Sequence, residues 1–131
     1  MNIGDFTLGL IADVTEAADR VHISLGGGAG FSEVTHRNAL AAELGQCQCE
    51  VTRPVYHKLK DGRAVAVGTV RFDIVYYNII IEIKVYPTKR ACSMTPQLKS
   101  QLCAYKRLLF ENEHLCSVSF YCDRVCVRVM P

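Results

Sequence analysis

The sequence predicts a single α/β (α+β) domain in which a mixed β-sheet is flanked by helices. Its 131 residues are the size of one ordinary domain, so residues 1–131 are assigned to one unit. Two helix-like segments come first, three strand-like segments rich in β-branched residues follow, and a third helix precedes two short strands. This order, ααβββαββ, favours a mixed sheet with helices over a helical bundle or a sandwich.

The helices are predicted from apolar spacing and from signals at their ends. The first segment places apolar side chains three and four residues apart, and the glycine-rich residues 25–30 end it. Ser32 suits an N-cap before an alanine-rich segment, and Pro96 suits a first helical turn. The three helices are expected over residues 5–24, 32–44 and 96–113.

The strands are predicted from runs of β-branched and aromatic residues. Asp61-Gly62 is a turn signal between the first two strands, and Pro54 suggests that the first is an edge strand or is bent. Tyr77 and Asn78 are expected to form a two-residue turn between the second and third. The strands are expected over residues 48–58, 64–76, 78–86, 114–122 and 124–130.

Three charged residues interrupt the most apolar part of the chain. With a two-residue turn, Asp73 faces Glu82 across the hairpin, and Lys84 lies on the same face as Glu82. Facing carboxylates repel each other near an apolar core. A shared proton, the Lys84 ammonium or a divalent cation would relieve this repulsion. A simple ion pair at the surface explains the charges equally well, so the pattern alone leaves both interpretations open.

Further motifs around these residues resemble those of a known group of nucleases. Asp73, followed by the Glu-Ile-Lys run at residues 82–84, is similar to the D…(D/E)xK signature of the PD-(D/E)XK nuclease superfamily. Gln101 and Tyr105 share a helix face and resemble the QxxxY motif of its RecB-like branch. These motifs occur in the order that the superfamily requires.

The segment before the strands resembles a smaller family within that superfamily. Residues 28–44 are similar to the GxGxxExxYxxAL segment of the GxxExxF family, and residues 21–26 to its VHxxLG segment. Glu33 is the glutamate of this motif, whereas His36 stands where the family usually has an aromatic residue. The glycine loop is also longer than the family's G-Pro-G, but no signature residue is missing.

The resemblance implies a restriction-endonuclease-like fold and hydrolysis of DNA phosphodiesters with Mg²⁺ or Mn²⁺. Lys84 would position or deprotonate the attacking water, and Tyr105 would support Gln101 from the same helix. The implied catalytic residues are Asp73, Glu82, Lys84, Glu33 and Gln101. The implied metal ligands are Asp73, Glu82, Glu33 and the carbonyl of Ile83. Without the resemblance, Glu33 is better explained as an acid that the helix dipole favours in a first turn.

Partners follow less directly from the residues. The net charge of +2 is too small to imply a nucleic-acid partner by itself. Lys89, Arg90 and Lys99 flank the implied site, so we expect them to contact DNA, and the resemblance makes a homodimer plausible by analogy. A non-catalytic nuclease fold that binds nucleic acid or has a structural role, and a metal-free protein-binding module, are the alternatives.

The cysteines and the hydropathy bear on location. The seven cysteines are an odd number, and the N-terminal residues do not resemble an export signal, so we expect reduced thiols and an intracellular protein. No CxxC pair occurs, which argues against a structural zinc site. No apolar run approaches the length of a membrane span, so no membrane association is expected.

Overall fold

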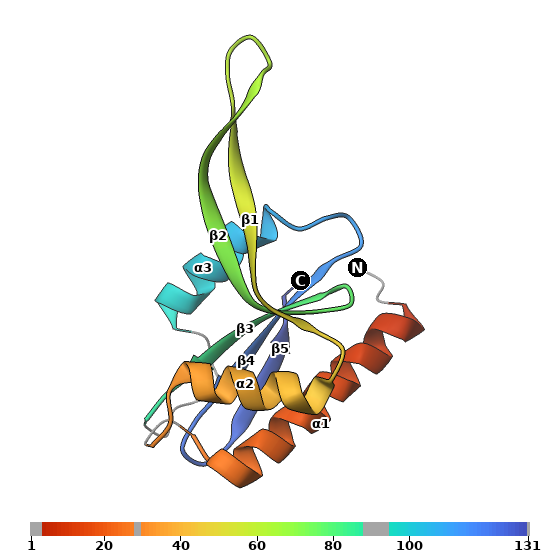
Figure 1. Ribbon diagram of the computed structural model, residues 1–131, viewed down its shortest axis with the longest axis vertical. Coiled ribbons are helices and arrows are strands. Elements are labelled where there is room, and N and C mark those ends of the chain that lie inside the picture. Colours follow the sequence, from red (N-terminus) through yellow and green to blue (C-terminus); the bar gives the residue numbers. More distant parts are fainter. Residues whose placement is uncertain (1–3, 28–29, 88–94, 131) are drawn as a thin grey trace.

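The computed structural model describes residues 4–27, 30–87 and 95–130, and its elements follow the predicted order (Figure 1). They are α1 (Asp5–Leu25), α2 (Glu33–Leu44), β1 (Gln48–Lys58), β2 (Ala64–Tyr76), β3 (Ile79–Val85), α3 (Pro96–Lys106), β4 (His114–Phe120) and β5 (Val125–Val129). The predicted fold class, a mixed sheet flanked by helices, is therefore confirmed.

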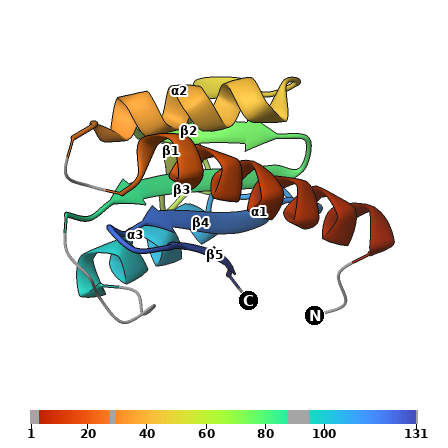
Figure 2. The same ribbon diagram turned by 90° about the horizontal axis from the view of Figure 1, so that it is seen from below.

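The five strands form one sheet in the order β1-β2-β3-β4-β5. Neighbouring strands are antiparallel except β3 and β4, which are parallel. A parallel pair needs a crossover connection, and α3 provides it. Figure 2 shows α1 and α2 on one face of the sheet and α3 on the other. The start of α2 and the start of α3 lie at the same end of the molecule as the end of β3 in both views.

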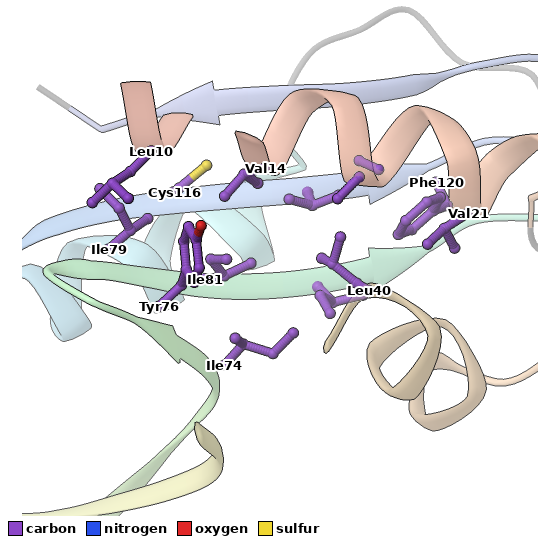
Figure 3. Close-up of a cluster of buried hydrophobic side chains, with 14 residues drawn as sticks. Leu10, Val14, Val21, Leu40, Ile74, Tyr76, Ile79, Ile81, Cys116 and Phe120 are labelled. Atoms are coloured by element: carbon purple, nitrogen blue, oxygen red, sulfur yellow. The ribbon is translucent and has the colours of Figure 1, made fainter. Parts of the chain in front are cut away.

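Two hydrophobic clusters hold these layers together. The larger one joins α1 and α2 to the sheet, and Figure 3 shows Val14 and Val21 of α1 pointing toward the strands beside Leu40 of α2. The smaller one lies under α3, where Leu98 and Leu102 pack against the other face of the sheet. The apolar spacing that predicted α1 is thus its buried face: Leu10, Val14, Ala17, Ala18 and Val21.

The expected two-residue turn between β2 and β3 is confirmed. Tyr76 pairs with Ile79, and Tyr77 adopts a left-handed φ of 52°. Tyrosine rarely takes this conformation, but here its hydroxyl donates to the Gln46 side chain at 2.8 Å. The Asn78 amide donates to the Asn112 carbonyl at 3.0 Å. These contacts fix the hairpin that carries Asp73 and Glu82.

The helix ends are partly as expected. The side chains of Ser32 and Thr95 accept hydrogen bonds from the backbone N–H of the third residue of α2 and of α3, which are N-cap interactions. However, α3 ends at Lys106 and not at residue 113. The residues after it favour helix by composition, but Glu113 instead accepts from the Phe110 N–H at 2.7 Å and closes a turn.

The hairpin of β1 and β2 projects well beyond the rest of the sheet (Figure 1). We call its outer part, residues 55–68, the arm. It begins at an irregularity in the ladder between Val55 and Tyr56, and residues 60–69 are all exposed. Pro54 lies on β1, which is an edge strand as expected, so its missing N–H costs no ladder hydrogen bond on the outer side.

One expectation about the cysteines is wrong. Cys126 is disulfide-bonded, whereas the sequence argument assigned reduced thiols throughout. Spacing along the chain cannot show which sulfur atoms meet in space, and a disulfide weakens the argument for a reducing compartment. Free thiols are carried by Cys47, Cys49, Cys103, Cys116 and Cys122. Among the helices that the structure describes, none is long and apolar enough to cross a membrane.

Candidate active site

Asp73 lies where β2 leaves the regular ladder of the sheet. The pairing of β2 with β3 runs from the turn only as far as Ile74 and Ile81. On the other side of Asp73, Glu50 of β1 has a left-handed φ of 55°, which interrupts the pairing there too. The Asp73 carboxylate instead accepts a hydrogen bond from the Ile83 N–H at 2.8 Å. The irregular backbone therefore ties this carboxylate to β3.

Glu82 and Lys84 of β3 lie beside Asp73, as alternation along the strands predicted. Glu82 is 5% exposed, and its carboxylate lies close enough to that of Asp73 for the two acids to influence each other. The Lys84 ammonium is 3.8 Å from Oε1 of Glu82. The other oxygen, Oε2, is buried without a hydrogen-bond partner. The structure thus brings the three charges together and leaves one carboxylate oxygen unsatisfied, which is uncommon for a buried polar atom.

Burial and the neighbouring carboxylates raise the pKa of Glu82. Burial and then the charge of Asp73 raise the pKa of Glu82 to about 8, against the opposing effect of Lys84. A hydrogen bond with Asp73 and the charge of Glu33 raise the pKa further, and Glu33 is the weakest of these causes. The pair of carboxylates therefore holds a proton near neutral pH unless another positive charge takes its place.

Glu33 is the first residue of α2 and is exposed. Its charge nevertheless reaches Glu82, so α2 brings this acid to the periphery of the site. The fully buried His36 fixes the start of α2. Its ring nitrogens lie 2.9 Å from the Gly26 carbonyl and 3.0 Å from the Ser32 carbonyl. Sequence reasoning noticed His36 only as a departure from an aromatic position, because its two partners depend on how the loop folds.

Gln101 and Tyr105 lie on α3 and contact each other. The Gln101 amide donates to the Tyr105 hydroxyl at 3.0 Å, and that hydroxyl lies 3.5 Å from the Arg71 carbonyl. The Tyr105 ring packs edge-on against Phe72 at 5.2 Å between centroids. Tyr105 therefore anchors Gln101 to β2, and its supporting role in a site stays a prediction.

A cavity of about 410 Å³ lies between the end of β3 and the start of α3. Lys84 and Gln101 both line it, so the cavity connects the hairpin to α3. The sequence does not indicate that Gln97 and Tyr86 line this cavity, because the crossover connection between β3 and β4 brings the two residues together. The lining residues are Lys84, Tyr86, Thr95, Gln97, Leu98 and Gln101.

Of the three residues expected to contact DNA, the structure describes only Lys99. Lys99 is exposed on α3 but does not line this cavity. Lys89 and Arg90 lie outside the described residues, so their expected role stays a prediction.

A comparison with protein families bears directly on this constellation. The family model of the PD-(D/E)XK nuclease superfamily matches residues 9–120, which run from the second turn of α1 to the end of β4. The chain belongs to the PD-(D/E)XK nuclease superfamily. The observed sheet with helices on both faces is consistent with the restriction-endonuclease-like fold that the resemblance implied. Members of this superfamily generally use divalent metals.

Other comparisons add little about this superfamily member. No curated protein matches the chain significantly. The crystal structure of SSO0001 is similar with a TM-score of 0.46 and 20% sequence identity. The similarity covers 92% of this chain, which spans 65% of the length of that one.

The donor atoms suit a hard divalent cation. Mg²⁺ is typically held by one or two carboxylates and completes its shell with water, and Asp73 and Glu82 provide such a pair. Oε2 of Glu82 is a buried oxygen without a hydrogen-bond partner, which is the kind of donor atom that such a cation takes. In residues 4–27, 30–87 and 95–130, no group of three or more His, Cys, Asp or Glu side chains is arranged to hold a metal. Ligation by the Ile83 carbonyl stays a prediction.

The raised pKa of Glu82 gives a test in the absence of metal. An unfolded glutamate has a pKa of about 4.3, so the folded chain binds this proton more tightly than the unfolded chain. The stability that the proton contributes is complete below about pH 4 and is lost as the pH rises through about 8. We expect Glu82→Gln to remove a decline of about 4 kcal/mol between roughly pH 5 and pH 9, measured by urea unfolding in EDTA.

The matched control for this measurement is Glu111→Gln, which changes an exposed glutamate. It should keep the wild-type dependence of unfolding free energy on pH. A Glu82→Gln variant whose stability declines with pH as steeply as the wild type would show that Glu82 does not hold this proton.

Proposed function

We propose that this superfamily member is a metal-dependent nuclease that hydrolyses DNA phosphodiesters. The single observation that carries the proposal is the pair of half-buried Asp73 and buried Glu82, with one oxygen of Glu82 unsatisfied and Lys84 at 3.8 Å. A purely structural ion pair would satisfy its buried oxygens, because an unpaired one costs stability. A site that binds a cation needs a carboxylate oxygen that is not already used in a hydrogen bond.

The proposed roles follow from the contacts. Asp73 and Glu82 would hold Mg²⁺ or Mn²⁺, with Glu33 and the Ile83 carbonyl as further ligands, directly or through water. Such an ion, when bound, lowers the pKa of water and neutralises phosphate charge. Lys84 lines the cavity, where its ammonium would orient the attacking water and stabilise negative charge on the phosphate.

The remaining residues would act on the substrate. Gln101, held by Tyr105, would position substrate or site groups inside the same cavity. Lys89, Arg90 and Lys99 would contact the phosphate backbone. Within the superfamily, the order of the motifs supports a place in the GxxExxF family and the RecB-like branch. An intracellular location, which the free thiols favour, and a homodimer, by analogy, complete the proposal.

A second function is favoured by one observation. The described residues contain no ready cluster of three metal-ligating side chains. A non-catalytic member that binds nucleic acid, or takes part in an assembly, through the same fold would need none. The absence of cleavage together with the absence of Mn²⁺ binding would support this alternative.

The test combines binding and cleavage. Plasmid and single-stranded DNA are incubated with the protein in Mg²⁺, Mn²⁺ or EDTA, and Mn²⁺ binding is followed by calorimetry. We expect metal-dependent cleavage by the wild type, and loss of both cleavage and Mn²⁺ binding in Asp73→Ala. Cleavage that survives in Asp73→Ala would mean that another site, or a contaminant, is responsible.

A further inference from the structure

A second cavity, of about 490 Å³, lies between the base of the arm and the segment that follows α3. We call it the arm-base pocket. It has no role in the proposed chemistry, because none of its lining residues lines the cavity beside Lys84. Its lining residues are Arg53, Pro54, Tyr56, Arg107, Leu108, Leu109 and Phe110.

Arg53 gives this pocket a rigid floor. Its guanidinium makes two hydrogen bonds of 2.6 Å to the Glu113 carboxylate and a third, of 3.3 Å, to the Leu108 carbonyl. It also lies 5.1 Å from the centre of the Phe72 ring and 4.2 Å from that of Phe110. The segment after α3 is therefore held against β1 by a fixed group, and the pocket is built before any ligand arrives.

Two aromatic rings stand at the pocket with most of their surface open. Tyr56 is 61% exposed and Phe110 is 64% exposed. Water does not favour such exposed rings, but they are the usual platforms on which unpaired bases stack. Because the bases of a duplex are already stacked on one another, a flat base can reach these rings only from a single strand.

The charge of the pocket suits an anion. Two of its lining residues are arginines and none is acidic. The charge of Arg53 is balanced by Glu113, whereas Arg107 is exposed at the C-cap of α3. A ligand with a flat apolar part and a negative charge matches this combination of rings and a guanidinium, and a nucleotide has both.

α3 links the pocket to the candidate active site. Thr95 and Gln97 at its start and Gln101 at its middle line the cavity beside Lys84, and Arg107 at its end lines the arm-base pocket. The helix has 11 residues and therefore rises by roughly 16 Å. A few nucleotides of extended single strand cover such a distance. Lys99 is exposed between the two ends.

We propose that the arm-base pocket binds an unpaired nucleotide of a DNA strand that continues along α3 to the candidate active site. The base stacks on Tyr56 and Phe110, and Arg107 binds its phosphate. The inference rests on the proposed function for the direction of the strand, and it adds that the bound substrate is single-stranded at this point.

The test measures binding without cleavage. Fluorescence anisotropy of end-labelled oligo-dT is recorded in EDTA with the full chain, with a duplex of equal length as competitor. We expect Phe110→Ala, Tyr56→Ala and Arg107→Ala each to weaken binding of oligo-dT about fivefold or more. Tyr56→Phe should restore wild-type binding because it keeps the ring. The duplex should compete poorly.

The matched control is Val67→Ala, which changes an exposed side chain of the arm that does not line the pocket. Circular dichroism confirms that each variant is folded. Equal binding by Phe110→Ala and wild type, or equal competition by duplex and single strand, overturns the inference. A loss of self-association in Phe110→Ala with unchanged oligo-dT binding overturns it as well, and identifies the pocket as a contact between copies.

The two proposals fail separately. If oligo-dT binding depends on the pocket but the protein does not cleave DNA with Mg²⁺ or Mn²⁺, the nuclease proposal fails and the binding site stands. If the protein cleaves DNA with Mg²⁺ or Mn²⁺ but its pocket variants bind oligo-dT as tightly as the wild type, the nuclease proposal stands and the pocket proposal fails.

Discussion

Replacing Lys84 by alanine is expected to slow DNA cleavage by about 100-fold or more while leaving Mn²⁺ affinity nearly unchanged. The ammonium lies 3.8 Å from Glu82 and lines the cavity, where it can act on water and phosphate. It is not a metal ligand, so its loss should reduce kcat rather than metal binding. Single-turnover cleavage and Mn²⁺ calorimetry on the same preparation measure the two effects.

Two variants make this result specific. Glu82→Gln removes a proposed metal ligand and should reduce both cleavage and Mn²⁺ affinity. Lys60→Ala removes an exposed cation near the tip of the arm and should leave both close to wild type. If Lys84→Ala cleaves DNA as fast as Lys60→Ala, the lysine of the signature has no part in the reaction.

Replacing Glu113 by alanine is expected to lower the free energy of unfolding by about 3 kcal/mol. The side chain of Glu113 is 8% exposed and that of Arg53 is 14% exposed, so the variant leaves a largely buried guanidinium without its partner. The Phe110 N–H also loses its acceptor. Urea unfolding at neutral pH, followed by circular dichroism, measures the change.

A double variant distinguishes the contribution of the ion pair to stability from the cost of leaving the buried Arg53 charge without its partner. Arg53→Met/Glu113→Leu removes both charges with apolar side chains of similar size and should be less destabilised than Glu113→Ala. The exposed pair of Arg63 and Asp61 is the matched control, and Asp61→Ala should change stability by no more than about 1 kcal/mol. A Glu113→Ala variant as stable as Asp61→Ala would contradict the structural role of Glu113.

Local patterns in the sequence predicted much of the fold. The eight elements, the turn at Tyr77 and the shared face of Glu82 and Lys84 follow from periodicity over a few residues. The proximity of Asp73 and Glu82 could be predicted for the same reason, since both carboxylates lie on one hairpin. The match to the superfamily needed more than this, namely several motifs in the correct order.

What the sequence could not predict depends on contacts between distant segments. The ion pair of Arg53 and Glu113 joins β1 to the turn before β4, in the segment where the composition had suggested that α3 continues. The bonds of His36 to two loop carbonyls depend on how α1 is followed by α2. The disulfide of Cys126 likewise required knowledge of spatial neighbours.

The placement of the acid pair on a single hairpin has a consequence for the order of folding. Contacts between residues close in the chain cost little loop-closure entropy and form readily. Asp73 and Glu82 can therefore meet as soon as the turn at Tyr77 closes. The cavity beside Lys84 must wait for the crossover to deliver α3 to the sheet. The acidic centre and the surface that would present a substrate to it are thus products of different stages of folding.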